Sequence, residues 1–175
     1  MQAIYFIVET LIGLYQVLLL LRLLMQLTRA DFRNPIGRGI VQLTDPLVQP
    51  LRRMLPPMGK VDTASVIAIV VVAALKLLIL RLLVGFGFPD PFFMLRAVAV
   101  DLVRLLLRTY LISIILNAIL SFVAPGNYSP AQSILASLCD PVLNPIRRVI
   151  PSIAGLDLSP LWACIAIQAL LLIIH

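Results

Sequence analysis

The sequence predicts an all-α integral membrane protein with four transmembrane helices in two tandem parallel repeats. The 175 residues are 61% hydrophobic and 13% charged, and the mean hydropathy is +1.06. Such a composition is typical of a chain that lies mostly in lipid. A proline-rich segment that starts at Asp45 recurs 95 residues later from Asp140, which indicates a duplicated structural unit. Each repeat is expected to hold an amphipathic, proline-broken surface segment between two membrane helices.

The register of this duplication holds without a gap. Residues 15–80 align with residues 110–175, and 16 of these 66 pairs are identical. We therefore expect a first repeat at 1–84, a linker at 85–101 and a second repeat at 102–175. The repeat motif consists of aspartates and prolines, namely Asp45, Pro46, Pro50, Pro56 and Asp62 in the first copy and Asp140, Pro141, Pro145, Pro151 and Asp157 in the second.

Four apolar stretches are expected to cross the membrane, for which a helix needs about 20 residues. They lie at 3–27, 61–83, 105–124 and 158–174. The first stretch has neither a basic region before it nor a small-residue cleavage site after it, so we expect it to stay attached. Because each repeat crosses twice, both repeats enter from the same side of the membrane.

An amphipathic segment separates the two membrane helices of each repeat. The Asn-Pro pair at 34–35 and the Ser-Pro pair at 129–130 each combine a helix cap with proline at the first helical position. Since proline lacks the N–H of a helical hydrogen bond, the Asp-Pro pair at 45–46 is expected to begin a second, short helix that is kinked at Pro50. Apolar residues at helical spacing predict one face that lies in or against the membrane. This apolar stripe comprises Ile40, Leu43, Leu47 and Leu51, matched by Leu135, Leu138, Val142 and Ile146.

Basic residues set the expected orientation and partner. The loops with the surface segments carry eight Lys and Arg residues, and the opposite side carries four. The positive-inside rule places these segments in the cytoplasm, at what we expect to be a bacterial inner (plasma) membrane. The net charge of +6 lies beside apolar runs, which favours anionic lipid over nucleic acid. The residues expected to bind lipid or a partner, or to serve only as topology anchors, are Arg52, Arg53, Arg147 and Arg148.

Four polar residues lie inside the expected spans, namely Glu9, Arg22, Lys76 and Asn117. Ionisable groups at such depths are rare, and they either pair or mark an ion path. Equal depths in an antiparallel hairpin predict a Glu9–Lys76 pair and bring Arg22 level with residue 63, beside Asp62. The second repeat replaces Lys76 by Leu171, so we expect structural pairing and not a symmetric ion path.

No pattern in the sequence indicates an enzyme. The chain lacks the HExxH, GxSxG, P-loop and paired-carboxylate arrangements of common enzymes, so we expect no catalytic residue, no metal and no cofactor. Cys139 and Cys164 form no CxxC motif and have no histidine nearby. We interpret them as small apolar residues.

The duplicated residues resemble the YggT family (also called YlmG) of small membrane proteins from bacteria and plastids. The resemblance covers both repeats and rests on the Asn/Ser-Pro opening, the DPLxxPLRRxLP core and the aspartate that follows. The second copy departs from the first where Pro57 becomes Ser152 and Gly59 becomes Ala154. Membership implies an association with cell division and envelope growth, nucleoid distribution, osmotic tolerance or plastid cytochrome assembly. It implies no catalytic residues.

These observations predict a non-enzymatic assembly or scaffolding factor whose basic surface segments meet anionic lipid, a membrane-protein partner or a second copy of the chain. The rival hypothesis is a small oligomeric channel or transporter for ion or osmotic homeostasis. The two hypotheses differ in whether Glu9 and Lys76 bond each other in a dry interface or line a hydrated cavity.

Overall fold

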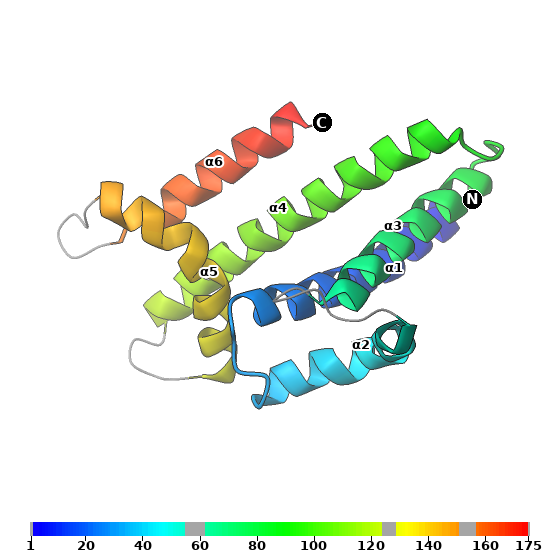
Figure 1. Cartoon of the computed structure of the whole chain (residues 1–175). Helices are drawn as coiled ribbons and strands as arrows, with labels where there is room; N and C mark the ends of the chain where they lie inside the picture. The colour runs from blue at the N-terminus through cyan, green and yellow to red at the C-terminus, as the bar shows by residue number, and fades with distance from the viewer. Residues whose placement is uncertain (1, 55–61, 124–128, 151–156, 175) are drawn as a thin grey trace. The chain divides into compact units, whose positions relative to one another are not determined.

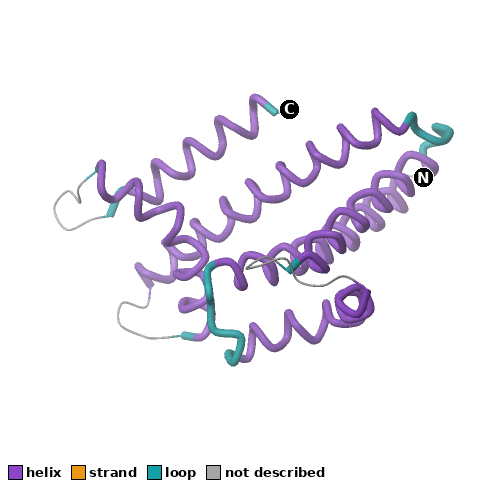
Figure 2. The backbone as a smooth tube through the Cα atoms, viewed as in Figure 1, coloured by secondary structure: helices purple, strands orange, loops and turns teal. Residues whose placement is uncertain are grey.

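The computed structural model describes residues 2–54, 62–123, 129–150 and 157–174, and every regular element in these ranges is a helix. The helices are α1 (Gln2–Leu27), α2 (Pro35–Met54), α3 (Thr63–Leu83), α4 (Pro91–Val123), α5 (Pro130–Val149) and α6 (Ser159–Ile173) (Figure 1). Figure 2 marks the described loops between them. The all-α prediction is confirmed. Among the described helices, α1, α3 and α4 are long and apolar enough to cross a membrane, whereas α6 is apolar but has 15 residues.

The chain divides into two compact units. Unit 1 comprises Met1–Leu23 and Gly39–Leu105, and unit 2 comprises Leu24–Arg38 and Leu106–His175. The segment in front of α2 therefore belongs to the same unit as α5 and α6. Within unit 2, the Asn34 side chain accepts a hydrogen bond from the backbone N–H of Ile36, at 3.0 Å, and donates one to the carbonyl of Pro130, at 2.6 Å. The openings of the two surface helices are thus bonded to each other.

Helix α4 begins earlier than the sequence analysis predicted. The Asp90 carboxylate accepts hydrogen bonds from the backbone N–H groups of Phe92 and Phe93, at 3.0 and 3.3 Å, and Pro91 takes the first helical position. The linker expected at 85–101 is helical from Pro91 onward. The helix expected at 105–124 has 33 residues, which makes it about 50 Å long at the α-helical rise.

The surface helices α2 and α5 are continuous through their prolines. Pro46 and Pro50 lie inside α2, and Pro141 and Pro145 lie inside α5. The prediction that a second helix begins at Asp45 was therefore wrong. A proline inside a helix costs about 3 kcal/mol, and α2 bends toward its C-terminal end (Figure 1). Pro56 and Pro151 lie outside the described residues.

Packing explains why α2 continues past its first proline. Ile40, Thr44 and Val48 are buried, the last two completely, and burying one large aliphatic side chain contributes about 1.5–3 kcal/mol. The predicted apolar stripe only partly coincides with this packed face, because its Leu43 is 59% exposed. The face of α2 that packs against the protein is centred one residue further along than Leu43.

Equivalent positions of the two repeats are buried. A core cluster in unit 2 consists of Ile114, Cys139, Leu143, Ala163 and Ile167. The residues 95 positions earlier are Leu19, Thr44, Val48, Ala68 and Val72, and none of them is more than 8% exposed. The duplication is therefore visible in the packing as well as in the sequence.

Candidate functional site

An arginine–aspartate pair links each surface helix to the start of the helix that follows it. Arg52 donates two hydrogen bonds to Asp62 Oδ2, one of them from Nε at 3.1 Å. Arg147 Nε donates to Asp157 Oδ2 at 2.8 Å. Both pairs join residues ten positions apart. The equivalent geometry explains why the motif carries an arginine and an aspartate at this spacing.

The two pairs differ in their surroundings. The Asp62 side chain is 5% exposed and also accepts a hydrogen bond from the Ser65 hydroxyl at 2.8 Å, whereas the Asp157 side chain is 40% exposed. Burial opposes ionisation of Asp62, but the bonds from Arg52 and Ser65 outweigh it and lower the pKa of this carboxyl. Burial likewise opposes ionisation of Asp157, whose pKa is lowered by the backbone N–H of Ser159 and by Arg147.

The second arginine of each motif is arranged differently. Arg53 and Arg148 are exposed, and neither forms a hydrogen bond or an ion pair with any residue in the described part of the chain. Of the four arginines that the sequence analysis singled out, Arg52 and Arg147 therefore have intramolecular partners. Within the described ranges, the guanidinium groups of Arg53 and Arg148 are the two of the four that have no such partner.

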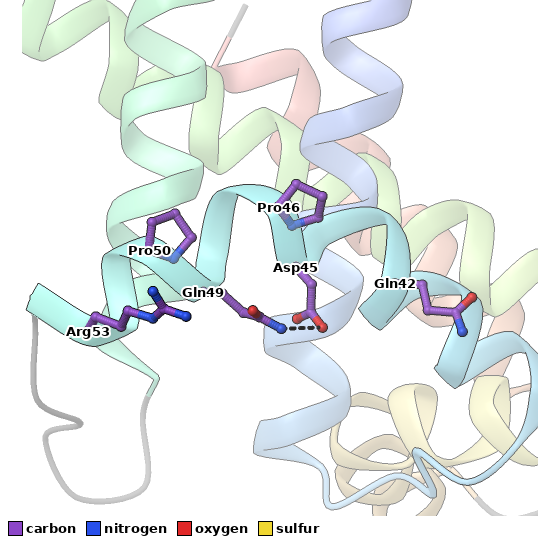
Figure 3. Close-up of a pocket in the computed structure, with 6 residues that line it drawn as sticks. All are labelled: Gln42, Asp45, Pro46, Gln49, Pro50 and Arg53. Atoms are coloured by element: carbon purple, nitrogen blue, oxygen red, sulfur yellow. Dashed lines mark hydrogen bonds between the residues drawn. The ribbon is translucent and has the colours of Figure 1, made fainter.

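The exposed face of α2 forms a shallow hollow of about 420 Å³. Figure 3 shows that Arg53 reaches along the helix toward Gln49 and that Gln49 lies next to Asp45. Gln49 Nε2 donates to Asp45 Oδ2 at 3.1 Å. We call this surface the polar face of α2, and it is lined by Gln42, Asp45, Pro46, Gln49, Pro50 and Arg53.

Arg22 of α1 ties this helix to the surface helix. Its Nη1 donates to Thr44 Oγ1 at 2.7 Å and to Asp45 Oδ1 at 2.8 Å. Arg22 is 4% exposed, so its charge is neutralised inside the protein. The Arg22 charge also contributes to the lowered pKa of Asp62, but the ion-pair partner of Arg22 is Asp45. The motif aspartate Asp45 therefore has a structural role in the first repeat.

The predicted Glu9–Lys76 pair was wrong. Lys76 Nζ lies 2.6 and 2.8 Å from the two carboxylate oxygens of Asp101, and Gln16 Nε2 donates to the same carboxylate at 3.1 Å. These contacts join α3, α4 and α1. Helices α1 and α3 run side by side in unit 1 (Figure 1). Glu9 is exposed, and Asn117 is half-buried. Asp101 lies before the start predicted for α4, at 105, so its contact with Lys76 was not predicted.

The described residues contain no group of three or more His, Cys, Asp or Glu side chains that could hold a metal ion. Cys139 and Cys164 are both free. Burial, followed by the charge of Asp140, raises the pKa of the Cys139 thiol to about 12. Its thiolate is therefore scarce at neutral pH, and the thiol is a poor nucleophile.

Comparison with known proteins places these features in a family context. The family model described as CCB3/YggT matches residues 1–83 and 97–175. An uncharacterized protein of Pseudomonas aeruginosa is 36% identical over 167 residues, which is 95% of this chain and 85% of the relative. The protein YggT of Escherichia coli K12, also uncharacterized, is 35% identical over 161 residues, 92% of this chain and 83% of its own. No solved structure matches the chain significantly.

Proposed function

Because the chain belongs to the CCB3/YggT family, whose match covers both repeats, we propose that it is a non-enzymatic assembly or scaffolding factor of the bacterial inner membrane. Its surface helices α2 and α5 contact anionic phospholipid, and they hold the protein where a membrane-protein partner or a second copy of the chain assembles on it. The process we assign to it is envelope or cell-division-related organisation.

One observation carries this proposal, namely the exposed arginine at the same position of both surface helices. Arg53 and Arg148 have no partner among the described residues, although their neighbours Arg52 and Arg147 do. A basic residue near an anionic leaflet contributes about 1 kcal/mol of attraction. Two such residues on one protein give a modest attraction. This attraction suits positioning of the protein at the membrane better than tight binding of a lipid.

The proposed topology follows from the charges and the repeat. The excess of Lys and Arg in the loops with the surface helices, eight against four, favours a cytoplasmic location for α2 and α5. We assign the fourth crossing to α6, because its 15 residues correspond to residues 64–78 of α3. At about 22 Å, α6 is shorter than the hydrocarbon core, and locally thinned lipid accommodates such a mismatch.

The rival function is a channel or transporter that uses the intramembrane charges. The Lys76 and Asp101 side chains bond each other directly, and the position equivalent to Lys76 is Leu171. A closed pair that only one repeat possesses supports a structural role more than a conduction path. We therefore expect liposomes containing the protein to show no ion flux above that of protein-free liposomes.

The test of the proposed function compares two double variants that each lose two positive charges. Arg53→Gln/Arg148→Gln removes the exposed arginine that recurs in both repeats. Arg33→Gln/Arg38→Gln is the matched control, because its two arginines are also exposed but do not recur in the second repeat. Native mass spectrometry after gentle extraction counts retained phospholipid. We expect the first variant to lose bound lipid at an unchanged melting temperature, and the control to retain it. Equal retention by both variants would overturn the proposed function.

A further inference from the structure

The polar face of α2 has a counterpart in α5. The residues 95 positions later in the chain are identical at four of its six positions, and at the other two they are smaller hydrogen-bonding residues. The counterpart, which we call the polar face of α5, comprises Ser137, Asp140, Pro141, Asn144, Pro145 and Arg148. The same types of residue therefore recur in α5, where Arg147 also lies 3.3 Å from Asn144 Oδ1 and 3.6 Å from Asp140 Oδ1.

Folding accounts for only part of this repetition. The buried side of α2 is formed by other residues, such as Thr44 and Val48, whereas the prolines and Arg53 are exposed. Prolines inside a helix weaken it. A face that is costly to the helix, exposed and present in both repeats indicates that a ligand binds there.

The prolines create hydrogen-bond acceptors on this face. In an α-helix, each carbonyl accepts from the N–H four residues later, but Pro46 and Pro50 have no N–H to give to the carbonyls of Gln42 and Pro46. The Asp45 carboxylate, which also accepts from Arg22 and Gln49, and the Gln49 amide oxygen line the same face (Figure 3). In α5, the carbonyls of residues 137 and 141 lose their helical donors in the same way.

At the other end of this face lies a donor with a positive charge. The Arg53 side chain reaches toward Gln49 (Figure 3), and an arginine binds phosphate through paired N–H groups. A ligand that complements the whole face thus carries a phosphate and, a few bonds away, a group that donates several hydrogen bonds. A primary ammonium group has three N–H donors and no acceptor.

We propose that the polar faces of α2 and α5 each bind the phosphoethanolamine headgroup of a membrane lipid, with the phosphate on Arg53 or Arg148 and the ammonium on the oxygens that the prolines leave free. This inference rests on the proposed contact between the surface helices and lipid phosphate. It adds that, at the two polar faces, the headgroup is zwitterionic and donates N–H hydrogen bonds. The arginines attract phosphate-bearing lipids in general. The free carbonyls select, among those lipids, the ones whose headgroup donates N–H hydrogen bonds.

Two lipids isolate the role of the ammonium. Phosphatidylethanolamine and phosphatidylcholine have the same phosphate and net charge, but the three methyl groups of choline remove every N–H donor. We expect purified protein in mixed nanodiscs to retain phosphatidylethanolamine over phosphatidylcholine by about tenfold, the ratio that follows from one hydrogen bond to a charged group. Equal retention of these two lipids by the unaltered protein would overturn the inference.

A proline variant tests the carbonyls without altering charge. Pro46→Ala/Pro141→Ala restores the helical N–H groups to the carbonyls of residues 42 and 137, and we expect the preference for phosphatidylethanolamine to fall severalfold with no loss of thermal stability. Pro35→Ala is the matched control, because Pro35 is the first residue of α2 and its missing N–H has no partner inside the helix. An unchanged preference in the double variant contradicts the inference.

The outcomes separate this inference from the proposed function. If phosphatidylglycerol is retained in preference to phosphatidylethanolamine and Arg53→Gln/Arg148→Gln abolishes that retention, the arginines bind anionic lipid and the ammonium site is wrong. If the arginine variant retains every lipid as well as its control does, the proposed function fails as well. Crosslinking of the face to a protein with no retained lipid also overturns the inference.

Discussion

The two repeats share a surface helix and a set of buried positions, but they do not share the polar residues of their membrane helices. Buried polar residues of the first repeat are replaced by less polar ones in the second, where Leu111, Asn117 and Leu171 correspond to Gln16, Arg22 and Lys76. The polar face and the arginine–aspartate pair, in contrast, recur in both. A property common to both repeats must therefore reside in the surface helices. The interior charges serve the packing of the first repeat alone.

Removing one partner of the buried Lys76–Asp101 pair should have the largest effect on stability. Lys76→Met leaves the Asp101 carboxylate without its ammonium partner, and breaking a buried pair in this way costs about 3–5 kcal/mol. The double variant Lys76→Met/Asp101→Asn should recover much of that loss. Unfolding in detergent measures the free energy of unfolding of Lys76→Met, of Asp101→Asn and of the double variant.

The control for this experiment is the equivalent position of the second repeat. Leu171→Met conserves volume and polarity, so it should cost less than about 1.5 kcal/mol. If the double variant loses as much free energy of unfolding as the two single variants together, residues 76 and 101 do not stabilise the fold as a pair. A comparable loss from Leu171→Met would remove the contrast between the two interiors.

The arginine–aspartate pairs should contribute unequally. Asp62→Asn removes charge-assisted hydrogen bonds from a side chain that is 5% exposed, which should cost about 2 kcal/mol. Asp157→Asn affects a pair whose two side chains are about 40% exposed, so the cost should be below about 1 kcal/mol. Urea unfolding of the two variants side by side measures the difference. Equal costs would contradict the conclusion that the Asp62 pair is more buried than the Asp157 pair.

The same pair predicts a loss of stability in acid. Because the pKa of Asp62 in the fold lies below its ordinary value of 3.8, its ionised form stabilises the fold. That contribution is complete above pH 3.8 and disappears as the pH falls through the lowered pKa. Melting temperatures measured across this range should fall less steeply for Asp62→Asn than for the unaltered protein. Parallel curves would show that Asp62 is not responsible.

The last comparison concerns two equivalent and fully buried residues, Thr44 and Cys139. Thr44→Cys removes the hydroxyl that accepts from Arg22 at 2.7 Å, and we expect it to cost about 1–2 kcal/mol. Cys139→Thr should cost less, because the new hydroxyl can donate to the carbonyl of Leu135, as Thr44 does to that of Ile40. Thermal unfolding compares the stability of the two variants. A larger loss of stability for Cys139→Thr than for Thr44→Cys would contradict the structural role of the Thr44 hydroxyl.

Local sequence patterns predicted some of the helix ends correctly but not others. The Asn-Pro and Ser-Pro pairs at 34–35 and 129–130 do begin helices. The Asp-Pro pair at 90–91 also begins one, whereas the Asp-Pro pairs at 45–46 and 140–141 lie in helix interiors. An aspartate before a proline marks the start of a helix only where the residues on both sides of the pair do not form one buried helix face. Burial of Thr44 and Val48 overrides the signal in α2, and a single sequence does not record such tertiary contacts.

The candidate site was predictable in part for similar reasons. The repeat pointed to the four arginines, because their recurrence is written in the sequence itself. It did not reveal that Arg52 and Arg147 bond aspartates ten residues away, since that depends on how the chain returns after each surface helix. Asp101 was missed as the partner of Lys76 because depth matching used only the first two helices. An earlier start of α4, signalled by Asp90 and Pro91, would have included it.

The central claim is that each repeat carries one equivalent lipid-contact site, and the number of bound lipids tests it most directly. Native mass spectrometry after gentle extraction should find two retained phospholipids on the unaltered protein. We predict one on Arg53→Gln, one on Arg148→Gln and none on the double variant, with all four proteins folded. If both single variants still hold two lipids, or if one of them alone loses both, the two surface helices are not equivalent sites and the claim is wrong.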